Sequence, residues 1–237
     1  AKYEEGELAF KHMEDYLALI FSDLCVSLKP PVGKEEEQRA DLLEIRRKLM
    51  VFHGLLRQRI SDSERMKSLS LLTRAERKML KDQPDRPIAY LQLIHRTLKE
   101  WWYQDRLHWN PLVSAMENAH HLQQERNVMV SLKLSPLVFP YAQMILIFML
   151  GYLSTLPFSL VSLSGAYTPI IAPWIVFAFW GLDEVALELE DPFGDDPNDF
   201  SMEDWEEDTD LILGGLHRAI DDTVPLRLLP SAEDVEG

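Results

Sequence analysis

A run of 49 consecutive residues, from Leu134 to Leu182, contains no Asp, Glu, Lys or Arg. These four residue types make up 27% of the 237-residue chain, so their absence from one long stretch is not a property of the whole sequence. A stretch of this length without charge indicates surroundings other than water. The run therefore predicts either a membrane segment or the closed interior of a protein.

The uncharged run divides at the sequence Ser-Gly-Ala-Tyr-Thr-Pro over residues 164–169. The first part, about Phe139–Leu163, forms roughly 37 Å of helix, which is enough to cross a bilayer core of about 30 Å. Pro157 is expected to kink this helix. The second part, Pro169–Leu182, gives only about 21 Å by itself, but the helix continues beyond Asp183 into polar surroundings. The sequence predicts a membrane hairpin whose second leg leaves the bilayer; the alternative is a buried hairpin in a soluble protein.

Charge is distributed unevenly on the two sides of this run. Residues 1–133 contain 22 Lys and Arg against 20 Asp and Glu, whereas residues 183–237 contain 2 against 19, a net charge of −17. An acidic tail repels nucleic acid, so nucleic acid is not expected as a partner. A hairpin places both flanking regions on one side of the membrane, and the basic residues before it predict that this is the cytoplasmic side or its organellar equivalent.

Apolar residues recur at helical spacing over about 7–28, 34–60, 87–107 and 111–132. Lys29-Pro30-Pro31-Val32-Gly33 ends the first of these helices, because neither proline can continue it. No segment has a strand pattern. The first 133 residues therefore predict a water-soluble helical bundle.

Two capping boxes, Ser61–Glu64 and Thr73–Glu76, mark the starts of short helices, because a hydroxyl and a Glu three residues later satisfy each other's backbone donors. The predicted protein is all-α and has three parts. Residues 1–133 form a cytosol-side helical region, residues 134–182 a transmembrane hairpin of two helices, and residues 183–237 an acidic helix end, a turn and a C-terminal tail.

The acidic turn after the second apolar helix is a candidate cation site. Asp195, Asp196 and Asp199 offer carboxylates within five residues, and Gly194 permits a sharp turn that brings backbone carbonyls in as well. Such oxygen donors suit a hard cation such as Ca²⁺. The alternative is an Asx-type turn that caps the helix and anchors the tail without metal. A further helix with an apolar stripe is expected around Asp208–Ile220.

Four segments together resemble the bestrophin family. They are Glu190–Phe200 (EDPFGDDPNDF), which is similar to the signature after the last transmembrane helix, and Phe179–Glu184 (FWGLDE), which is similar to the approach to it in bacterial, algal and plant members. Upstream, Ser135–Gln143 (SPLVFPYAQ) resembles the entry to the third transmembrane helix. Ala1–Phe10 (AKYEEGELAF) resembles the end of the second transmembrane helix. The four segments occur in the family's order and extend over nearly the whole chain.

The resemblance implies a pentameric anion channel for chloride and often bicarbonate, with four transmembrane segments in each protomer. Its partners are then membrane lipids, small anions and further copies of the chain, or a larger membrane assembly. A multi-pass protein of this kind is expected in the plasma membrane or in an organellar membrane, thylakoid or mitochondrial inner. The family's first transmembrane helix and pore neck precede the position of Ala1. We therefore expect either a part of a longer chain or a reduced homologue.

The resemblance also assigns individual residues. In animal bestrophins the acidic turn is a calcium clasp, and Asp196 and Asp199 match its carboxylate ligands, with Asp191 and Asp195 at positions that give backbone oxygens. Pro197-Asn198 departs from this pattern, as in members not gated by calcium, so no cofactor is required and Ca²⁺ is a candidate ligand only. A second constriction of the pore lies near the helix that begins at Asn110, where Leu112 is the candidate pore-lining residue; ordinary core packing is its alternative.

Three functions follow from these observations. The first is an anion channel subunit. The second is a reduced, non-conducting bestrophin-like scaffold in a larger membrane complex. The third is a soluble helical protein or enzyme, but the sequence contains no nucleophile constellation, phosphate-binding loop or metal-hydrolase spacing, so no enzyme is predicted.

Overall fold

The structure is a computed structural model that describes residues 2–30, 35–61, 67–134, 139–188, 193 and 199–228. Every regular element in these ranges is a helix, as the sequence predicted. The elements are α1 (Lys2–Ser27), α2 (Glu35–Ile60), η1 (Lys67–Leu71), α3 (Arg74–Leu80), α4 (Arg86–Tyr103), α5 (Trp109–Leu134), α6 (Phe139–Ser164), η2 (Gly165–Tyr167), α7 (Thr168–Glu188) and α8 (Met202–Arg218).

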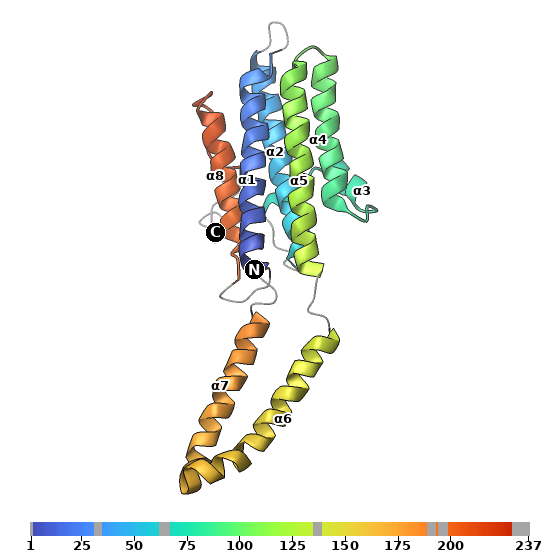
Figure 1. Ribbon diagram of the computed structural model, residues 1–237. Helices are drawn as coiled ribbons and strands as arrows, with labels where there is room; N and C mark the ends of the chain where they lie inside the picture. The colour runs from blue at the N-terminus through green and yellow to red at the C-terminus, as the bar shows by residue number, and fades with distance from the viewer. Residues whose placement is uncertain are drawn as a thin grey trace.

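The helices form an elongated bundle from which one helical pair extends. Helices α1, α2, α4 and α5 lie lengthwise beside one another, and α8 packs against α1 and α2 (Figure 1). Helices α6 and α7 leave one end of the bundle and meet at η2 (Figure 1). The two termini of the uncharged run are therefore joined to the same end of the bundle.

Helix α1 shows how the apolar spacing builds the core. Met13, Leu17 and Leu24 are fully buried, because residues three, four and seven apart lie on one face of a helix. The apolar pattern over about residues 7–28 also predicts Leu19 and Val26 on the buried side of this helix, and this prediction is wrong, because they are 49% and 83% exposed. They lie on a different face of α1 and do not contribute to the core.

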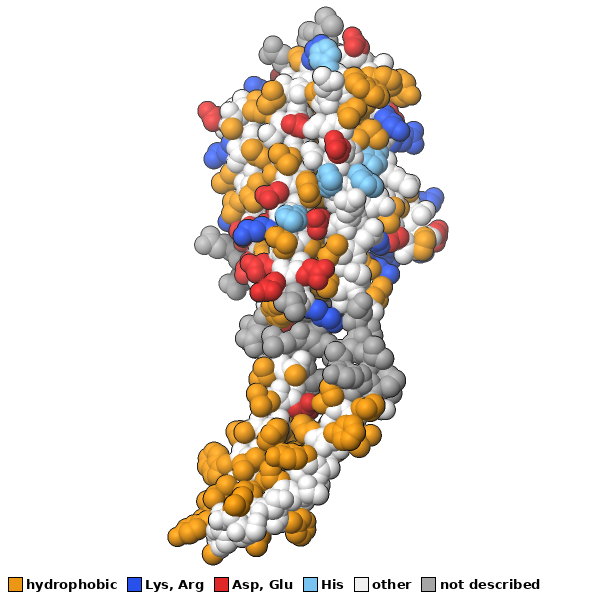
Figure 2. All heavy atoms as spheres, in the orientation of Figure 1, with side chains coloured by type: hydrophobic (Ala, Val, Ile, Leu, Met, Phe, Trp, Pro, Cys, Tyr) orange, Lys and Arg blue, Asp and Glu red, His pale blue; other side chains and the backbone are white. Residues whose placement is uncertain are grey.

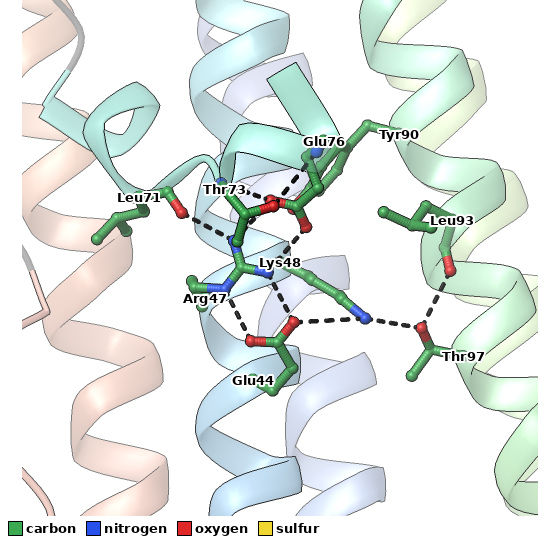
Figure 3. Close-up of polar contacts among 9 residues, drawn as sticks. All are labelled: Glu44, Arg47, Lys48, Leu71, Thr73, Glu76, Tyr90, Leu93 and Thr97. Atoms are coloured by element: carbon green, nitrogen blue, oxygen red, sulfur yellow. Dashed lines mark hydrogen bonds and ion pairs between the residues drawn. The ribbon is translucent and has the colours of Figure 1, made fainter. Parts of the chain in front are cut away.

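The bundle is tied together on one side by an ionic network around Arg47 of α2 (Figure 3). The guanidinium donates two parallel hydrogen bonds to the carboxylate of Glu76 in α3, of 2.9 and 2.8 Å, and two to Glu44, of 2.8 and 2.6 Å. It also donates to the carbonyl oxygen of Leu71, at 2.8 Å. The hydroxyl of Tyr90 in α4 donates to Glu76 at 2.9 Å. One guanidinium thereby links α2 to α3, and through Glu76 to α4.

The predicted capping box at the start of α3 is confirmed. The backbone N–H of Glu76 donates to Thr73 Oγ1 at 3.3 Å, and the backbone N–H of Thr73 donates to Glu76 Oε2 at 2.9 Å. The other predicted box, Ser61–Glu64, lies almost wholly outside the described residues. Helix α4 ends at Tyr103, earlier than predicted, because the chain turns at Asp105, whose φ of 56° is incompatible with a continuing helix.

Helices α6 and α7 expose their apolar side chains. Residues Gln143–Ala186 form a run long and apolar enough to cross a membrane, and only 11% of its most apolar stretch is buried. Phe158 and Leu163 of α6 are 81% and 86% exposed, and Trp174 and Phe177 of α7 are both 72% exposed. Figure 2 shows these two helices largely covered by apolar side chains, with charged side chains gathered on the bundle. The alternative of a hairpin buried inside its own protomer does not fit this exposure.

Proline lies within both helices, at Pro157 in α6 and Pro173 in α7. In the turn before Pro157, the hydroxyl of Ser154 donates to the carbonyl oxygen of Leu150 at 2.7 Å, and that of Thr155 donates to Gly151 at 3.2 Å. These bonds keep the polar hydroxyls occupied in a stretch that has no charged side chain.

The Arg47 network predicts a specific acid sensitivity. Burial favours a higher pKa for Glu76, but hydrogen bonds donated by Arg47, Thr73 and Tyr90 outweigh it and lower the pKa from 4.5 to about 2. A lowered pKa stabilises the folded state above about pH 4.5, and this contribution is lost as the pH falls towards 2. A shift of this size corresponds to about 3 kcal/mol. We therefore expect Glu76→Gln to lower the free energy of unfolding at pH 7 by about 2–3 kcal/mol and to remove that part of the acid dependence.

Thermal unfolding followed by circular dichroism in detergent, between pH 2 and 7, measures this effect. Glu100→Gln is the matched control, because Glu100 is 55% exposed and pairs with Arg96 one turn away on the same helix. The control is expected to change stability by less than about 0.5 kcal/mol. Equal losses in the two variants would contradict the assignment.

Candidate functional site

The described residues of the acidic turn after α7, which are Phe193, Asp199 and Phe200, lie beside the N-terminal part of α1. Asp195 and Asp196, two of the three predicted metal ligands, lie outside the described residues. The third, Asp199, accepts a hydrogen bond at Oδ1 from the hydroxyl of Tyr3, at 3.1 Å. The two residues are 196 positions apart. The carboxylate of Asp199 therefore joins the tail to the N-terminal helix.

Aromatic rings hold this junction together. Phe193 is fully buried and its ring centre lies 5.8 Å from that of Phe10 in α1. Phe200 stacks on Trp205 of α8 at 4.9 Å and contacts Tyr3 at 4.8 Å. We call Tyr3, Phe10, Phe193, Phe200 and Trp205 the aromatic clamp. The sequence analysis did not identify it, although Phe193 and Phe200 flank the acidic residues directly.

Gly6 makes the close approach of the clamp to α1 possible. A Cβ atom at this position would lie 3.2 Å from Cζ of Phe193 and 3.6 Å from Cε2 of Phe200. The contact with Phe193 is tighter than most packed side chains adopt, whereas that with Phe200 is an ordinary van der Waals distance, so a larger residue would displace the Phe193 ring. Gly6 belongs to the segment AKYEEGELAF, which the sequence analysis compared with the end of the second transmembrane helix of the family.

The described residues do not assemble a metal site. Within the described ranges, no three His, Cys, Asp or Glu side chains are placed so that they could hold one ion. Calcium binding by Asp195, Asp196 and Asp199 stays a prediction, since two of these residues are outside those ranges.

Leu112 lies in the first turn of α5, at the end of the bundle away from α6 and α7 (Figure 1). Its side chain is 2% exposed and belongs to the main hydrophobic core, the packing role that the sequence analysis gave as its alternative. Its neighbours Trp109 and Val113 are 60% and 40% exposed. A pore-lining role for Leu112 stays a prediction; in the single protomer the accessible side chains of this turn are those of its neighbours.

Helix α8 is attached to the bundle by buried charge pairs. Arg46 of α2 and Asp210 of α8 are both almost fully buried, and Nη2 of Arg46 donates to Oδ1 of Asp210 at 2.7 Å. Arg46 also donates to the carbonyl oxygens of Pro225 and Leu226, at 2.8 and 2.6 Å. The carboxylate of Glu206 accepts hydrogen bonds from the backbone of η1, including one of 2.7 Å from Ser68. Part of the acidic excess of the tail is therefore used for packing inside the protomer.

Two further basic side chains of α2, Arg57 and His53, are buried in the bundle. Arg57 has no exposed surface; burial lowers its pKa to about 10, although the carboxylates of Glu206 and Glu14 oppose the shift. Burial and the charge of Arg57 lower the pKa of His53 well below its ordinary value, so His53 is neutral at pH 7.

The aromatic clamp gives a test of how the acidic turn is held. Tyr3→Phe keeps the ring but removes the hydrogen bond to Asp199, and we expect it to lower the free energy of unfolding by about 1 kcal/mol. In a chain of this size the thermal midpoint falls by about 2–4 °C. Tyr103→Phe is the matched control, because the Tyr103 side chain is 78% exposed.

Measuring both variants with and without 1 mM CaCl₂ distinguishes the two interpretations of the turn. A structural turn gives the same loss under both conditions. A midpoint of the unaltered protein that rises with calcium, and no longer rises in Asp199→Asn, would show that the turn binds calcium instead.

Comparison with known proteins gives the family. A sequence model described as "Bacterial/Fungal Bestrophin protein" matches residues 15–211. A voltage-dependent anion channel-forming protein of Mesorhizobium japonicum is 38% identical over 66 residues, which are 27% of this chain and 21% of that protein. One from a Nostoc species is 32% identical over 92 residues, 39% of this chain and 28% of that protein. The matched stretches span less than a third of each of these relatives.

Solved structures share the fold. A bacterial bestrophin homologue from Klebsiella pneumoniae, carrying a single substitution, superposes with a TM-score of 0.80 at 18% identity. The match covers 91% of this chain and 78% of that one. The arrangement of bundle, extended helical pair and returning tail is therefore shared with a known structure.

Proposed function

Because the chain belongs to the bacterial and fungal bestrophin family of membrane proteins, we propose that it is a subunit of an anion channel that conducts chloride and bicarbonate as a pentamer. The names of the curated relatives, which describe proteins that form voltage-dependent anion channels, support this proposal. The structural observation that carries it is the exposed apolar surface of α6 and α7 beside a charged bundle. Passive conduction requires no bond chemistry, so the proposal assigns no catalytic residue.

In this proposal α6 and α7 cross the bilayer as a hairpin. A helix of 26 residues such as α6 is about 39 Å long, which exceeds a bilayer core of about 30 Å and leaves room for tilt. Trp174 and Trp180 of α7 are 72% and 60% exposed, and exposed Trp is common near membrane interfaces. The bundle and the tail then share the cytoplasmic side, or its organellar equivalent, of a plasma, thylakoid or mitochondrial inner membrane.

The anion pathway on that side is placed at the first turn of α5. A helix N-terminus carries unpaired N–H groups and the positive end of the helix dipole, so it attracts an anion without a basic side chain. In this proposal Val113, which is 40% exposed, borders the pathway beside Leu112, the predicted pore-lining residue. This arrangement accounts for an anion pathway at a surface without a basic cluster.

Planar-bilayer recordings of the full-length protein test the proposal. We expect currents whose reversal potential follows the chloride gradient, and a pentameric mass by native mass spectrometry. Val113→Asp places a negative charge at the proposed pathway and is expected to reduce the current about tenfold, which corresponds to about 1.4 kcal/mol of repulsion. Val113→Asn is the matched neutral control and is expected to conduct like the unaltered protein.

A folded, oligomeric protein that carries no anion current would contradict the channel proposal. That outcome would favour the second candidate, a non-conducting scaffold subunit of a larger membrane complex. The exposed Trp102, Tyr103 and Trp109, which contact one another at the tip of the bundle, offer a surface for such a partner.

A further inference from the structure

A basic groove runs along the side of the bundle where α2 ends beside α3 and the turn that leads into α4. It consists of two adjoining hollows of about 390 and 300 Å³ that share Leu55, Gln58 and Arg86. The first hollow is lined mainly by polar groups, with Arg59 and Gln83 beside the shared residues. The second is lined mainly by apolar ones. Its further lining residues are Leu69, Leu72, Arg77, Leu80 and Lys81.

The groove carries uncompensated positive charge. Arg59, Arg77, Lys81 and Arg86 line it, and neither hollow has a carboxylate in its lining. In the part of the chain that the structure describes, none of these four cations forms an ion pair. The groove therefore has four cations with no anionic partner from those ranges.

Three carboxylates adjoin lining residues in the sequence, and none of them lines either hollow. Asp82 is one of them, and Glu76 is held by Arg47. The third is Asp85, which is already hydrogen-bonded. Its Oδ1 accepts the backbone N–H of Ile88 at 3.2 Å and so caps α4, while its Oδ2 is paired with Arg126. Burial, together with the positive charge of Arg59, lowers the pKa of Arg126. Asp85 thus already binds a donor at each carboxylate oxygen, and it forms no ion pair with Arg59 or Arg86.

We propose that this basic groove binds a phosphate monoester that carries an apolar group. Arginine forks match phosphate oxygens in pairs, and Arg59 and Arg86 face the polar hollow together with the amides of Gln58 and Gln83. A phosphate monoester carries a charge of about −1.5 to −2, which suits several unpaired cations better than one carboxylate does. The apolar group lies in the second hollow, against Leu69 and Leu72.

The position of the groove allows two sources for such a ligand. Helix α3 lies in the half of the bundle from which α6 and α7 extend (Figure 1). A phosphate monoester there is either the headgroup of an anionic lipid or a soluble ester from the aqueous side. Both ligands would bind through the same phosphate monoester group, and the experiment below distinguishes the lipid headgroup from the soluble ester.

Isothermal titration of the full chain in detergent with hexyl phosphate tests the site, with inorganic phosphate and hexanol as the two halves of the probe. We expect hexyl phosphate to bind more tightly than either half. Arg59→Gln with Arg86→Gln is expected to weaken binding about tenfold or more, because it removes charge-assisted hydrogen bonds. Arg74→Gln with Lys78→Gln is the matched control: it removes the same charge from α3 at residues outside both linings and is expected to have little effect.

A second variant tests the apolar hollow and shows whether a loss of binding is caused by misfolding. Leu72→Gln is expected to weaken hexyl phosphate binding several-fold, since it makes one wall of the apolar hollow polar, and to leave inorganic phosphate unaffected. Equal weakening by the groove and control pairs would overturn the proposal, as would inorganic phosphate binding as tightly as hexyl phosphate. Absence of hexyl phosphate binding to the folded, unaltered chain would overturn it as well.

Nanodiscs of two lipid compositions distinguish a lipid headgroup from a soluble ester as the source of the ligand. The chain is placed in discs of phosphatidylcholine alone or with one fifth phosphatidic acid, and hexyl phosphate is titrated into both. Competition by phosphatidic acid that disappears in the Arg59→Gln, Arg86→Gln variant supports the site with a lipid headgroup as its ligand. Equal binding in both discs, lost in that variant, supports it with a soluble ester.

Discussion

The apolar surface of α6 and α7 is the constraint on which the rest of the structure depends. These helices expose Phe158, Leu163, Trp174 and Phe177, and no charged residue lies between Leu134 and Leu182 to make contact with water favourable. Each large apolar side chain favours transfer out of water by about 1.5–3 kcal/mol. In the proposed channel a bilayer, alone or together with neighbouring subunits, covers this surface, and both flanking regions lie on the same side of it.

The acidic tail that follows α7 is attached to the N-terminal end of the bundle. Asp199 accepts a hydrogen bond from Tyr3, which lies 196 residues earlier in the chain. The aromatic clamp fixes one end of the connection. Farther along, Arg46 binds Asp210 and the backbone of η1 binds Glu206, so charge pairs fix α8 against α2. Within the protomer, carboxylates of the acidic segment thus accept hydrogen bonds from particular donors of the bundle.

The sequence predicts the helices well because their signals are local. Apolar spacing gives α1, α2 and α5 within a few residues, and Thr73 with Glu76 gives the start of α3. Interactions between distant segments leave no comparable signal. Arg47 is 29 residues from Glu76, and nothing in the sequence of either indicates the other as its partner.

The same limitation applies to the candidate site. The acidic turn can be recognised from its residues, but its attachment to α1 depends on Phe193 and on the space left by Gly6. The assignment of a helix face also needs the neighbouring helices. Leu19 and Val26 are as apolar as the buried residues of α1, yet they point away from its partners. The basic groove is formed by residues of α2, η1, α3 and the start of α4, so no local sequence pattern predicts it.

Solvent accessibility of spin labels tests most directly whether α6 and α7 lie in a bilayer. Cys25 is the only cysteine in the chain, so replacing it by serine allows single labels at Phe158, Phe177 and, as the water-exposed reference, Tyr103. In liposomes, the account predicts that labels at Phe158 and Phe177 collide readily with oxygen but poorly with a water-soluble nickel chelate, and that the label at Tyr103 shows the reverse. If all three labels were equally accessible to the nickel chelate, the hairpin would not lie in the membrane.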